Sequence, residues 1–235
     1  MTRTLAIVGM GKMGHAVAEL APSRGWEVVA KLRQADTARG ITKTLLNGAQ
    51  VAVEFTTPRA AAENAAAILR AGCALVVGTT GWYARLPEIS ALAKQENGAL
   101  LTAANFSLGV NIFERVATLA AELLSRTPGF EAQLIETHHS AKKDAPSGTA
   151  ATLAAAASAA WGKPIPVASV RVGSVPGTHE FVFDAPFEQI HLEHIARDRR
   201  VFAEGALVAA GWLIGKHGVF TMRDVIAQSS TGHNA

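Results

Sequence analysis

The sequence predicts an α/β fold in which a doubly wound parallel sheet is followed by a mixed α+β region. Between residues 5 and 105, short β-branched runs alternate with alanine-rich stretches of helical character. Compact apolar runs of this kind are typical of parallel strands covered on both faces, and a repeated β-α-β order favours a doubly wound sheet. After residue 106 the alternation stops and longer segments follow. We therefore expect two regions of different architecture.

Five short runs are predicted to form the parallel strands. The helix between the third and fourth runs has the clearest ends. Thr57 can cap its N-terminus, Pro58 suits its first turn and Gly72 suits its C-terminal end. The runs are Leu5–Gly9, Trp26–Ala30, Val51–Thr56, Ala74–Gly78 and Ala99–Ala103.

The second region combines long helices with strands that alternate apolar and polar residues. Alternation over 179–183 and 188–195 is typical of half-exposed antiparallel strands. We expect helices over 110–126, 147–160 and 200–215, and strands over 130–136, 167–172, 179–183 and 188–195.

Composition excludes several classes of protein. Cys73 is the only cysteine, so a disulfide framework and a cysteine zinc site are excluded. The net charge of +3 comes from scattered residues and the aromatic content is 6%, which argues against nucleic-acid binding. The chain shows no signal-peptide layout and no apolar run of about 18 residues. We expect a soluble cytoplasmic protein with neither a membrane nor a nucleic-acid partner.

A glycine-rich loop follows the first predicted strand and opens a helix. In this position glycines allow a tight turn, close approach of a pyrophosphate and close helix–sheet packing, while the helix N-terminus offers N–H groups to phosphate. The alternative is turn chemistry alone. The predicted dinucleotide loop is Gly9, Met10, Gly11, Lys12, Met13 and Gly14.

Basic residues stand where an NAD-binding chain carries an acid. After the second strand no carboxylate occurs before Asp36, whereas Lys31 and Arg33 are close by. These residues, with Lys12, favour the 2′-phosphate of NADP, unless they are only solvated loop charges. We expect NADPH as cofactor, with NADH possible.

Two further loops follow the fourth and fifth predicted strands. Small hydroxyl residues and glycine at the C-terminal ends of strands suit a nicotinamide–ribose site, although each loop alone could be an ordinary turn. We assign Gly78, Thr79 and Thr80, and then Ala104, Asn105, Phe106 and Ser107, to this site.

Three titratable side chains, His138, His139 and Lys142, occur within five residues directly after a predicted strand. They offer donors and a transferable proton, and Ser147-Gly148-Thr149 at a helix start offers an anion site. The pattern suits a carboxylate substrate that is protonated after hydride delivery.

Three other interpretations of this segment are open. It could be an exposed loop, Ser147 could be a nucleophile, or His138 and His139 could bind a metal with Glu136. Pro-Ser-Gly lacks the usual nucleophile elbow, and adjacent histidines on an extended chain point to opposite sides. We therefore expect no metal.

Together these strings resemble the dihydrodipicolinate reductases (4-hydroxy-tetrahydrodipicolinate reductases) of bacterial and plant lysine biosynthesis. The resemblance covers nearly the whole chain, and the long His-His string is highly specific. The matching strings are Gly9-Met-Gly-Lys-Met-Gly14, Gly78-Thr-Thr-Gly81, Ala104-Asn-Phe-Ser-Leu-Gly-Val-Asn111, Glu136-Thr-His-His-x-x-Lys-x-Asp-Ala-Pro-Ser-Gly-Thr-Ala150, Arg171-x-Gly173 with Pro176-Gly-x-His179, and Met222-Arg-Asp-Val225.

The resemblance implies a Rossmann-like dinucleotide-binding domain with an inserted α+β substrate and oligomerisation domain. The first would comprise residues 1–106 plus 215–235, and the second residues 107–214. It further implies a homotetramer assembled through the sheets of the substrate domains.

By position, the resemblance makes His138 the acid/base group and Lys142 the proton donor. His139, Ser147, Gly148 and Thr149 would hold the carboxylates of a dicarboxylate substrate. Hydride would reach ring C4, and the resulting enamine would be protonated at C3.

The chain departs from the family pattern at several places. The longer glycine loop and the acid after the second strand are missing, which bears on cofactor preference. Ser140 and Ala141 are small where some relatives carry basic residues.

Two other classes of function stay open, a Rossmann-like ligand sensor without turnover and another dinucleotide oxidoreductase such as an aspartate dehydrogenase. Intact His138 and Lys142 argue against the sensor.

Overall fold

The computed structural model describes residues 2–38 and 40–229, so residues 1, 39 and 230–235 of the predicted first domain lie outside the described residues. The chain forms two compact units, one of Met1–Leu108 with Arg200–Ala235 and one of Gly109–Arg199. Each unit has its own sheet and its own buried core. The interrupted arrangement expected from the resemblance is therefore present.

The first unit contains a six-stranded parallel sheet in the order β10-β5-β4-β3-β1-β2. Strand order changes direction between β1 and β3, and ligands of open α/β sheets bind at such a point, beyond the carboxyl ends of the strands. The five predicted strands are confirmed, and β10 was not predicted. The strands are β1 (Arg3–Val8), β2 (Trp26–Leu32), β3 (Val51–Glu54), β4 (Ala74–Val77), β5 (Ala99–Thr102) and β10 (Gly218–Phe220).

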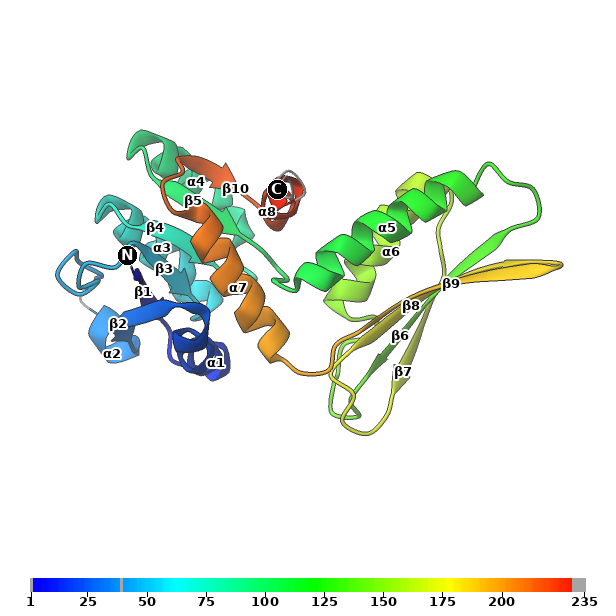
Figure 1. The fold of residues 1–235 in the computed structure, drawn as a ribbon, viewed down its shortest axis with the longest axis horizontal. Helices are drawn as coiled ribbons and strands as arrows, with labels where there is room; N and C mark the ends of the chain where they lie inside the picture. The colour runs from blue at the N-terminus through cyan, green and yellow to red at the C-terminus, as the bar shows by residue number, and fades with distance from the viewer. Residues whose placement is uncertain (1, 39, 230–235) are drawn as a thin grey trace. The chain divides into compact units, whose positions relative to one another are not determined.

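Helices cover both faces of this sheet, as the compact apolar strands require (Figure 1). One core joins the strands to α1 (Lys12–Leu20), α7 (Arg200–Leu213) and α8 (Met222–Ser229). The core on the other face joins them to α3 (Pro58–Arg70) and α4 (Leu86–Gln95). The short helix α2 (Gln34–Thr37) follows β2, and 3₁₀ turns occupy Pro22–Arg24 and Tyr83–Arg85.

The second predicted domain boundary, at 214/215, is wrong. Helix α7 belongs to the first unit, where Ala203, Ala206 and Ala210 are fully buried in the core beside the sheet. These small side chains let the helix axis approach the strands closely. The inserted unit therefore ends at Arg199, and its first boundary, after Leu108, is close to the predicted one.

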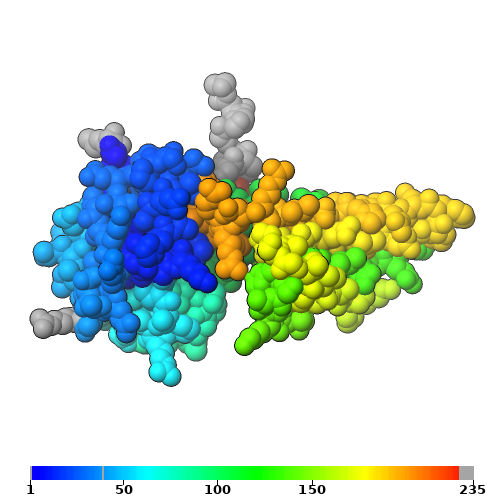
Figure 2. All heavy atoms as spheres, turned by 90° about the horizontal axis from the view of Figure 1, so that it is seen from below, coloured from blue at the N-terminus to red at the C-terminus, as the bar shows by residue number. Residues whose placement is uncertain are grey.

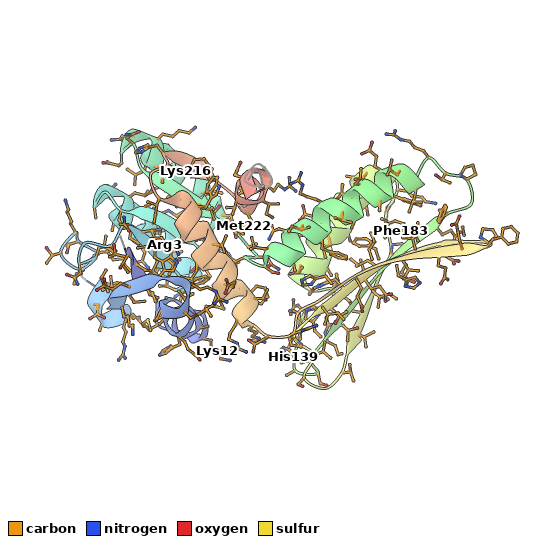
Figure 3. All side chains as sticks on the ribbon, viewed as in Figure 1. Arg3, Lys12, His139, Phe183, Lys216 and Met222 are labelled. Carbon is orange, nitrogen blue, oxygen red and sulfur yellow. The ribbon has the colours of Figure 1, made fainter. Side chains whose placement is uncertain are left out.

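The second unit packs two helices on one face of a four-stranded mixed sheet in the order β7-β6-β8-β9. Strands β6 and β7 are parallel and are connected through α6, whereas β8 and β9 form an antiparallel hairpin that extends to one end of the unit (Figures 1 and 2). Phe181 and Phe183 are fully buried beneath the helices, and Figure 3 labels Phe183. The elements are α5 (Leu108–Leu124), β6 (Glu131–His138), α6 (Gly148–Trp161), β7 (Val167–Arg171), β8 (Thr178–Ala185) and β9 (Glu188–Ile195).

Among residues 2–38 and 40–229, every helix is too short or too polar to cross a bilayer.

Gly205 of α7 tests the close packing of this helix on the first unit. An alanine Cβ at this position would overlap the backbone carbonyl oxygen of Phe106. We expect Gly205→Ala to lower the free energy of unfolding by about 2 kcal/mol or more, measured by urea denaturation, because backbone atoms yield little to overpacking.

The matched control is Gly211→Ala in the same helix. There the nearest atom to the new Cβ belongs to the flexible guanidinium of Arg3, at 2.7 Å, and Trp26 lies at an ordinary contact distance of 3.6 Å. Both variants gain the same helix propensity. Equal stabilities for the two variants would contradict the packing argument.

Candidate active site

The register of the second sheet places five polar side chains together at one end. Glu136 of β6 pairs with His179 on one neighbouring strand and with Ser169 on the other, and His138 pairs with Arg171. Since side chains alternate along a strand, Glu136 and His138 share the face on which Leu134 enters the core. The end of β6 thus delivers titratable groups beneath the N-terminus of α6.

Glu136 is fully buried and is the centre of this cluster. One carboxylate oxygen accepts hydrogen bonds from Arg171 at 2.7 Å and from the backbone N–H of Ser147 at 3.3 Å. The other oxygen lies against Nδ1 of His138. Burial acts to raise the pKa of Glu136, but the hydrogen bonds from Arg171, Ser169 and His138 outweigh it and lower the pKa to about 2. The carboxylate is therefore charged at neutral pH.

Two buried histidines stand edge to face beside this carboxylate, His138 and His179, with ring centroids 5.3 Å apart. Burial lowers the pKa of His138, with the charges of Lys142 and Arg171 adding to the effect and Glu136 opposing it. Burial also lowers the pKa of His179, to about 4. Both imidazoles are therefore neutral at pH 7. With Glu136 accepting at Nδ1, the His138 proton belongs on Nδ1, which leaves Nε2 as an acceptor.

Lys142 lies in the turn after β6, and its ammonium contacts both carboxylate oxygens of Asp144, at 2.8 and 2.9 Å. Arg171 fixes the same turn by donating to the Asp144 carbonyl oxygen at 2.6 Å. One guanidinium thus holds both the buried carboxylate and the loop that carries the lysine. His139 is half-buried, and its Nε2 lies 3.3 Å from the guanidinium of Arg199.

Ser147 is buried, and its position changes its expected role. It is the N-cap of α6, where its hydroxyl accepts from the backbone N–H of Ala150 at 3.1 Å and lies 3.5 Å from Nε2 of His179. Gly148 is exposed and begins the helix, where N–H groups lack intrahelical acceptors. Thr149 is half-buried in the same turn. The anion site predicted here therefore depends on backbone groups more than on the Ser147 hydroxyl.

The structure brings together a different histidine pair from the one the sequence offered for a metal. Glu136, His138 and His179 have ligand atoms within 4.8 Å of one another, whereas the metal alternative had used His139. Both carboxylate oxygens already have hydrogen-bond partners, and Arg171 places a positive charge on one of them. We interpret the cluster as a hydrogen-bonded network, and the absence of a metal stays a prediction.

In the first unit, the glycine loop lies between β1 and α1, as predicted. Gly9 has a φ of +95°, and an added Cβ would overlap Phe55, while one on Gly14 would overlap the Gly9 carbonyl. Gly11 is different, because its φ is −79° and an added Cβ would have no protein atom within 4 Å. Neither backbone strain nor packing requires glycine there, so the open space fits the close approach of a phosphate group.

The remaining loop residues of the predicted cofactor site differ in exposure. Gly78 packs against Phe55, and Thr79 is buried and accepts from the backbone N–H of Thr56 at 2.8 Å, while Thr80 is exposed. Phe106 and Ser107 are buried, so their side chains belong to the protein interior. Ala104 is exposed and Asn105 half-buried. For Phe106, any cofactor contact is restricted to the backbone.

The basic residues expected near the adenosine are exposed. Lys12 is the first residue of α1 (Figure 3), and Lys31 and Arg33 flank the last residue of β2. The Asp36 carboxylate accepts from the backbone N–H of Arg33 at 2.7 Å, so Asp36 caps the start of α2. Met10 and Met13 are half-buried against the core.

Sequence reasoning gave no role to Arg171, His179 or Glu54. Arg171 and His179 stood in recognised strings, and an arginine or histidine at a buried strand position could have drawn attention to them. Glu54 is a fully buried acid at the end of β3, where it contacts Thr56 and Asn64. Burial raises the pKa of Glu54, although hydrogen bonds from Thr56, Thr79 and Asn64 act to lower it.

Comparison with protein families gives one consistent result. The model described as dihydrodipicolinate reductase, N-terminus, matches residues 3–106, and the one described as dihydrodipicolinate reductase, C-terminus, matches residues 109–226. The chain belongs to the dihydrodipicolinate reductase family. The two matches meet where the first unit gives way to the second, although the C-terminal match also includes α7.

Named relatives agree with this assignment to the dihydrodipicolinate reductase family. A 4-hydroxy-tetrahydrodipicolinate reductase from Christiangramia forsetii is 33% identical, covering 95% of this chain and 97% of that protein. One from Methanoregula boonei is 38% identical, covering 77% of this chain and 76% of that protein.

Solved structures agree on the fold of this dihydrodipicolinate reductase family member. The dipicolinate-bound dihydrodipicolinate reductase from Paenisporosarcina sp. TG-14 matches with a TM-score of 0.82 at 22% identity, covering 95% of this chain and 99% of that one. An aspartate dehydrogenase from Thermotoga maritima matches with a TM-score of only 0.52 at 11% identity, covering 92% and 98%.

The low pKa of His179 predicts how stability depends on pH. The unfolded chain binds a proton near pH 6.5 and the folded chain only near pH 4, so stability falls as the pH drops through this window. We expect His179 to contribute a loss of about 3 kcal/mol between pH 6.5 and 4, since one pKa unit corresponds to about 1.4 kcal/mol.

Replacing His179 by glutamine should therefore flatten the dependence of the unfolding free energy on pH, measured by urea denaturation at several pH values. His138 and His194 shift in the same direction, so some slope remains. His15→Gln, on the exposed side of α1, is the control. An unchanged slope in His179→Gln would contradict the burial of a neutral imidazole.

Proposed function

We propose that this protein is an NAD(P)H-dependent 4-hydroxy-tetrahydrodipicolinate reductase, which forms tetrahydrodipicolinate in lysine and diaminopimelate biosynthesis. The observation that carries the proposal is the buried Glu136–His138 pair beside Lys142, in a chain whose two units both match the family. The 4-hydroxyl group of the substrate must leave as water to give the unsaturated ring, and a nicotinamide cofactor would then supply the hydride to ring C4. The protein must then supply a proton to C3 and hold the substrate.

Proton delivery falls to Lys142 in this proposal. Its ammonium is a donor held by Asp144, whereas His138 is neutral and its Nε2 accepts. We therefore assign the donation of the proton at C3 to Lys142 and the orientation of the reacting group to His138. This division refines the expectation from the resemblance, in which His138 is the acid/base group and Lys142 the proton donor.

The substrate carboxylates are assigned to the first turn of α6 and to His139. The backbone N–H of Gly148 and the residue Thr149 lie at the positive end of a helix, and the Ser147 cap fixes that end in place. Arg199 stands beside His139 and adds a positive charge. These groups support a small dicarboxylate substrate.

We infer that NADPH is preferred, with NADH possible. The support is the open space at Gly11 and the exposed basic side chains Lys12, Lys31 and Arg33 around the end of β2. Gly9, Met10, Met13 and Gly14, with Gly78, Thr79, Thr80 and the backbone of residues 104–107, complete the proposed cofactor site.

We also infer a cytoplasmic homotetramer with no membrane or nucleic-acid partner. The free buried thiol of Cys73 and the biosynthetic relatives support the location. The alternative function is a ligand sensor without turnover, which the paired Lys142 and Asp144 do not favour.

The assay follows NADPH oxidation with the condensation product of pyruvate and aspartate semialdehyde. We expect Lys142→Ala to lower kcat by roughly 10²-fold or more, because a positioned acid is lost. Lys143→Ala is the matched control, since Lys143 is the next residue and is exposed. Tight nucleotide binding without any turnover in the wild type would favour the sensor, and unchanged turnover in Lys142→Ala would remove the lysine from the mechanism.

Cofactor preference is tested separately. In Lys31→Ala/Arg33→Ala we expect the ratio of kcat/KM for NADPH to kcat/KM for NADH to fall by about tenfold or more, since a charge pair with phosphate is worth over 1 kcal/mol when well formed. Lys43→Ala, which also removes an exposed positive charge from the first unit, is the control. A ratio that does not change would assign both residues to the solvated surface.

A further inference from the structure

One face of α5 carries an uninterrupted stripe of exposed apolar side chains. Ile112, Val116, Leu119 and Leu123 are 48, 46, 56 and 57% exposed, respectively. The opposite face of the helix is buried in the core of the second unit through Phe113, Ala117 and Ala121. Single exposed apolar residues are ordinary, but a stripe along a whole helix marks an interaction surface.

The spacing of the stripe indicates what kind of surface it fits. The four residues follow one another at intervals of four, three and four, which are the a and d positions of a heptad. Such a seam packs against a second helix that carries a seam of the same kind. Among the described helices, α5 itself has this pattern on an exposed face.

Two exposed charges, Arg115 and Glu122, flank the stripe on the same side, both at g positions of the heptad. If two copies of α5 pair antiparallel about a two-fold axis, Val116 meets Leu119 of the other copy and Ile112 meets Leu123. In this register Arg115 faces Glu122 of the other copy, and the pair occurs twice. In a parallel pair Arg115 would face Ala120 and Glu122 would face Thr127, which offer no charge. The surface is therefore complementary to itself in one orientation only.

We propose that the exposed stripe of α5 is an interface with a second copy of this chain, in which the two helices run antiparallel. The stripe lies on the helix side of the second unit, so it is distinct from the open face of the sheet, which the resemblance assigns to assembly. A tetramer with closed dihedral symmetry needs more than one two-fold interface, and α5 supplies one. A stable interface covers roughly 800 Å² per partner over about 20–30 residues a side, so the four side chains of the stripe are one part of a larger contact.

Engineered disulfides test both the contact and its orientation. Cys73 is the only native thiol and is buried, so background cross-linking is low. In the double variant Val116→Cys/Leu119→Cys, an antiparallel pair places the new thiol at position 116 of one copy opposite the new thiol at position 119 of the other. The two thiols are then within disulfide range. We expect a covalent dimer on a non-reducing gel from the double variant and little from either single variant. Efficient cross-linking of both single variants would instead demonstrate a parallel pair and overturn the proposal.

A second measurement follows the oligomer without cross-linking. We expect Leu119→Glu to raise the dissociation constant of the assembly by about 100-fold, measured by light scattering and sedimentation, because two charges would be buried in an apolar seam. Ser125→Glu, which adds the same charge off the seam near the helix end, should change it little. Equal assembly of the two variants, each with wild-type circular dichroism, would contradict the proposal.

A charge exchange completes the test. Arg115→Glu should weaken assembly by about threefold to thirtyfold, because it sets two like-charge contacts in the interface. Adding Glu122→Arg to it should restore the wild-type constant. Glu122 also pairs at 2.7 Å with Arg126 of its own chain, just after α5, so Arg126→Gln serves as the control for loss of that exposed pair and should change assembly little. Failure of the double variant to recover assembly would rule out the antiparallel register.

Discussion

The carboxylate of Glu136 is the constraint on which the second unit depends. A buried charge is tolerated only when it is paired and hydrogen-bonded. Here the carboxylate is held by Arg171 of β7, by His138 and by the backbone N–H of Ser147 at the start of α6. Arg171, which pairs with it, also fixes the loop that carries Lys142. One guanidinium therefore both neutralises the buried carboxylate and positions the loop of Lys142.

The first unit relies on a different constraint, the close approach of backbone segments. Glycines at 9, 14 and 205 each stand where a Cβ would overlap a backbone carbonyl group. Gly9 lets the turn after β1 approach the end of β3, Gly14 lets α1 start against that turn, and Gly205 lets α7 approach the segment after β5. Of the three glycines in the loop, Gly11 has no such contact, so the packing that shapes the loop leaves open space at this position. Rigid neighbours and one vacant position are what a phosphate-binding turn requires.

Much of this could be predicted from sequence, and the failures have physical reasons. The five parallel strands carry strong local patterns, so the sequence predicts them close to the bounds that the structure gives. The boundary at 214/215 was wrong because α7 is a helix whose small buried residues reveal nothing locally about which sheet they face. The roles of Arg171 and His179 depend on strand register between segments far apart in sequence, which single-sequence patterns do not encode.

The return of the chain to its first unit at Arg200 has a consequence for folding. The core on one face of the six-stranded sheet is completed by residues 203–213, 222 and 225, which follow the whole inserted unit in the chain. During synthesis, the whole inserted unit therefore emerges before the first unit has received α7 and α8, which cover one face of its sheet. Folding of the outer unit must wait for the C-terminal segment, and until then its apolar strands are exposed to chaperones or to aggregation.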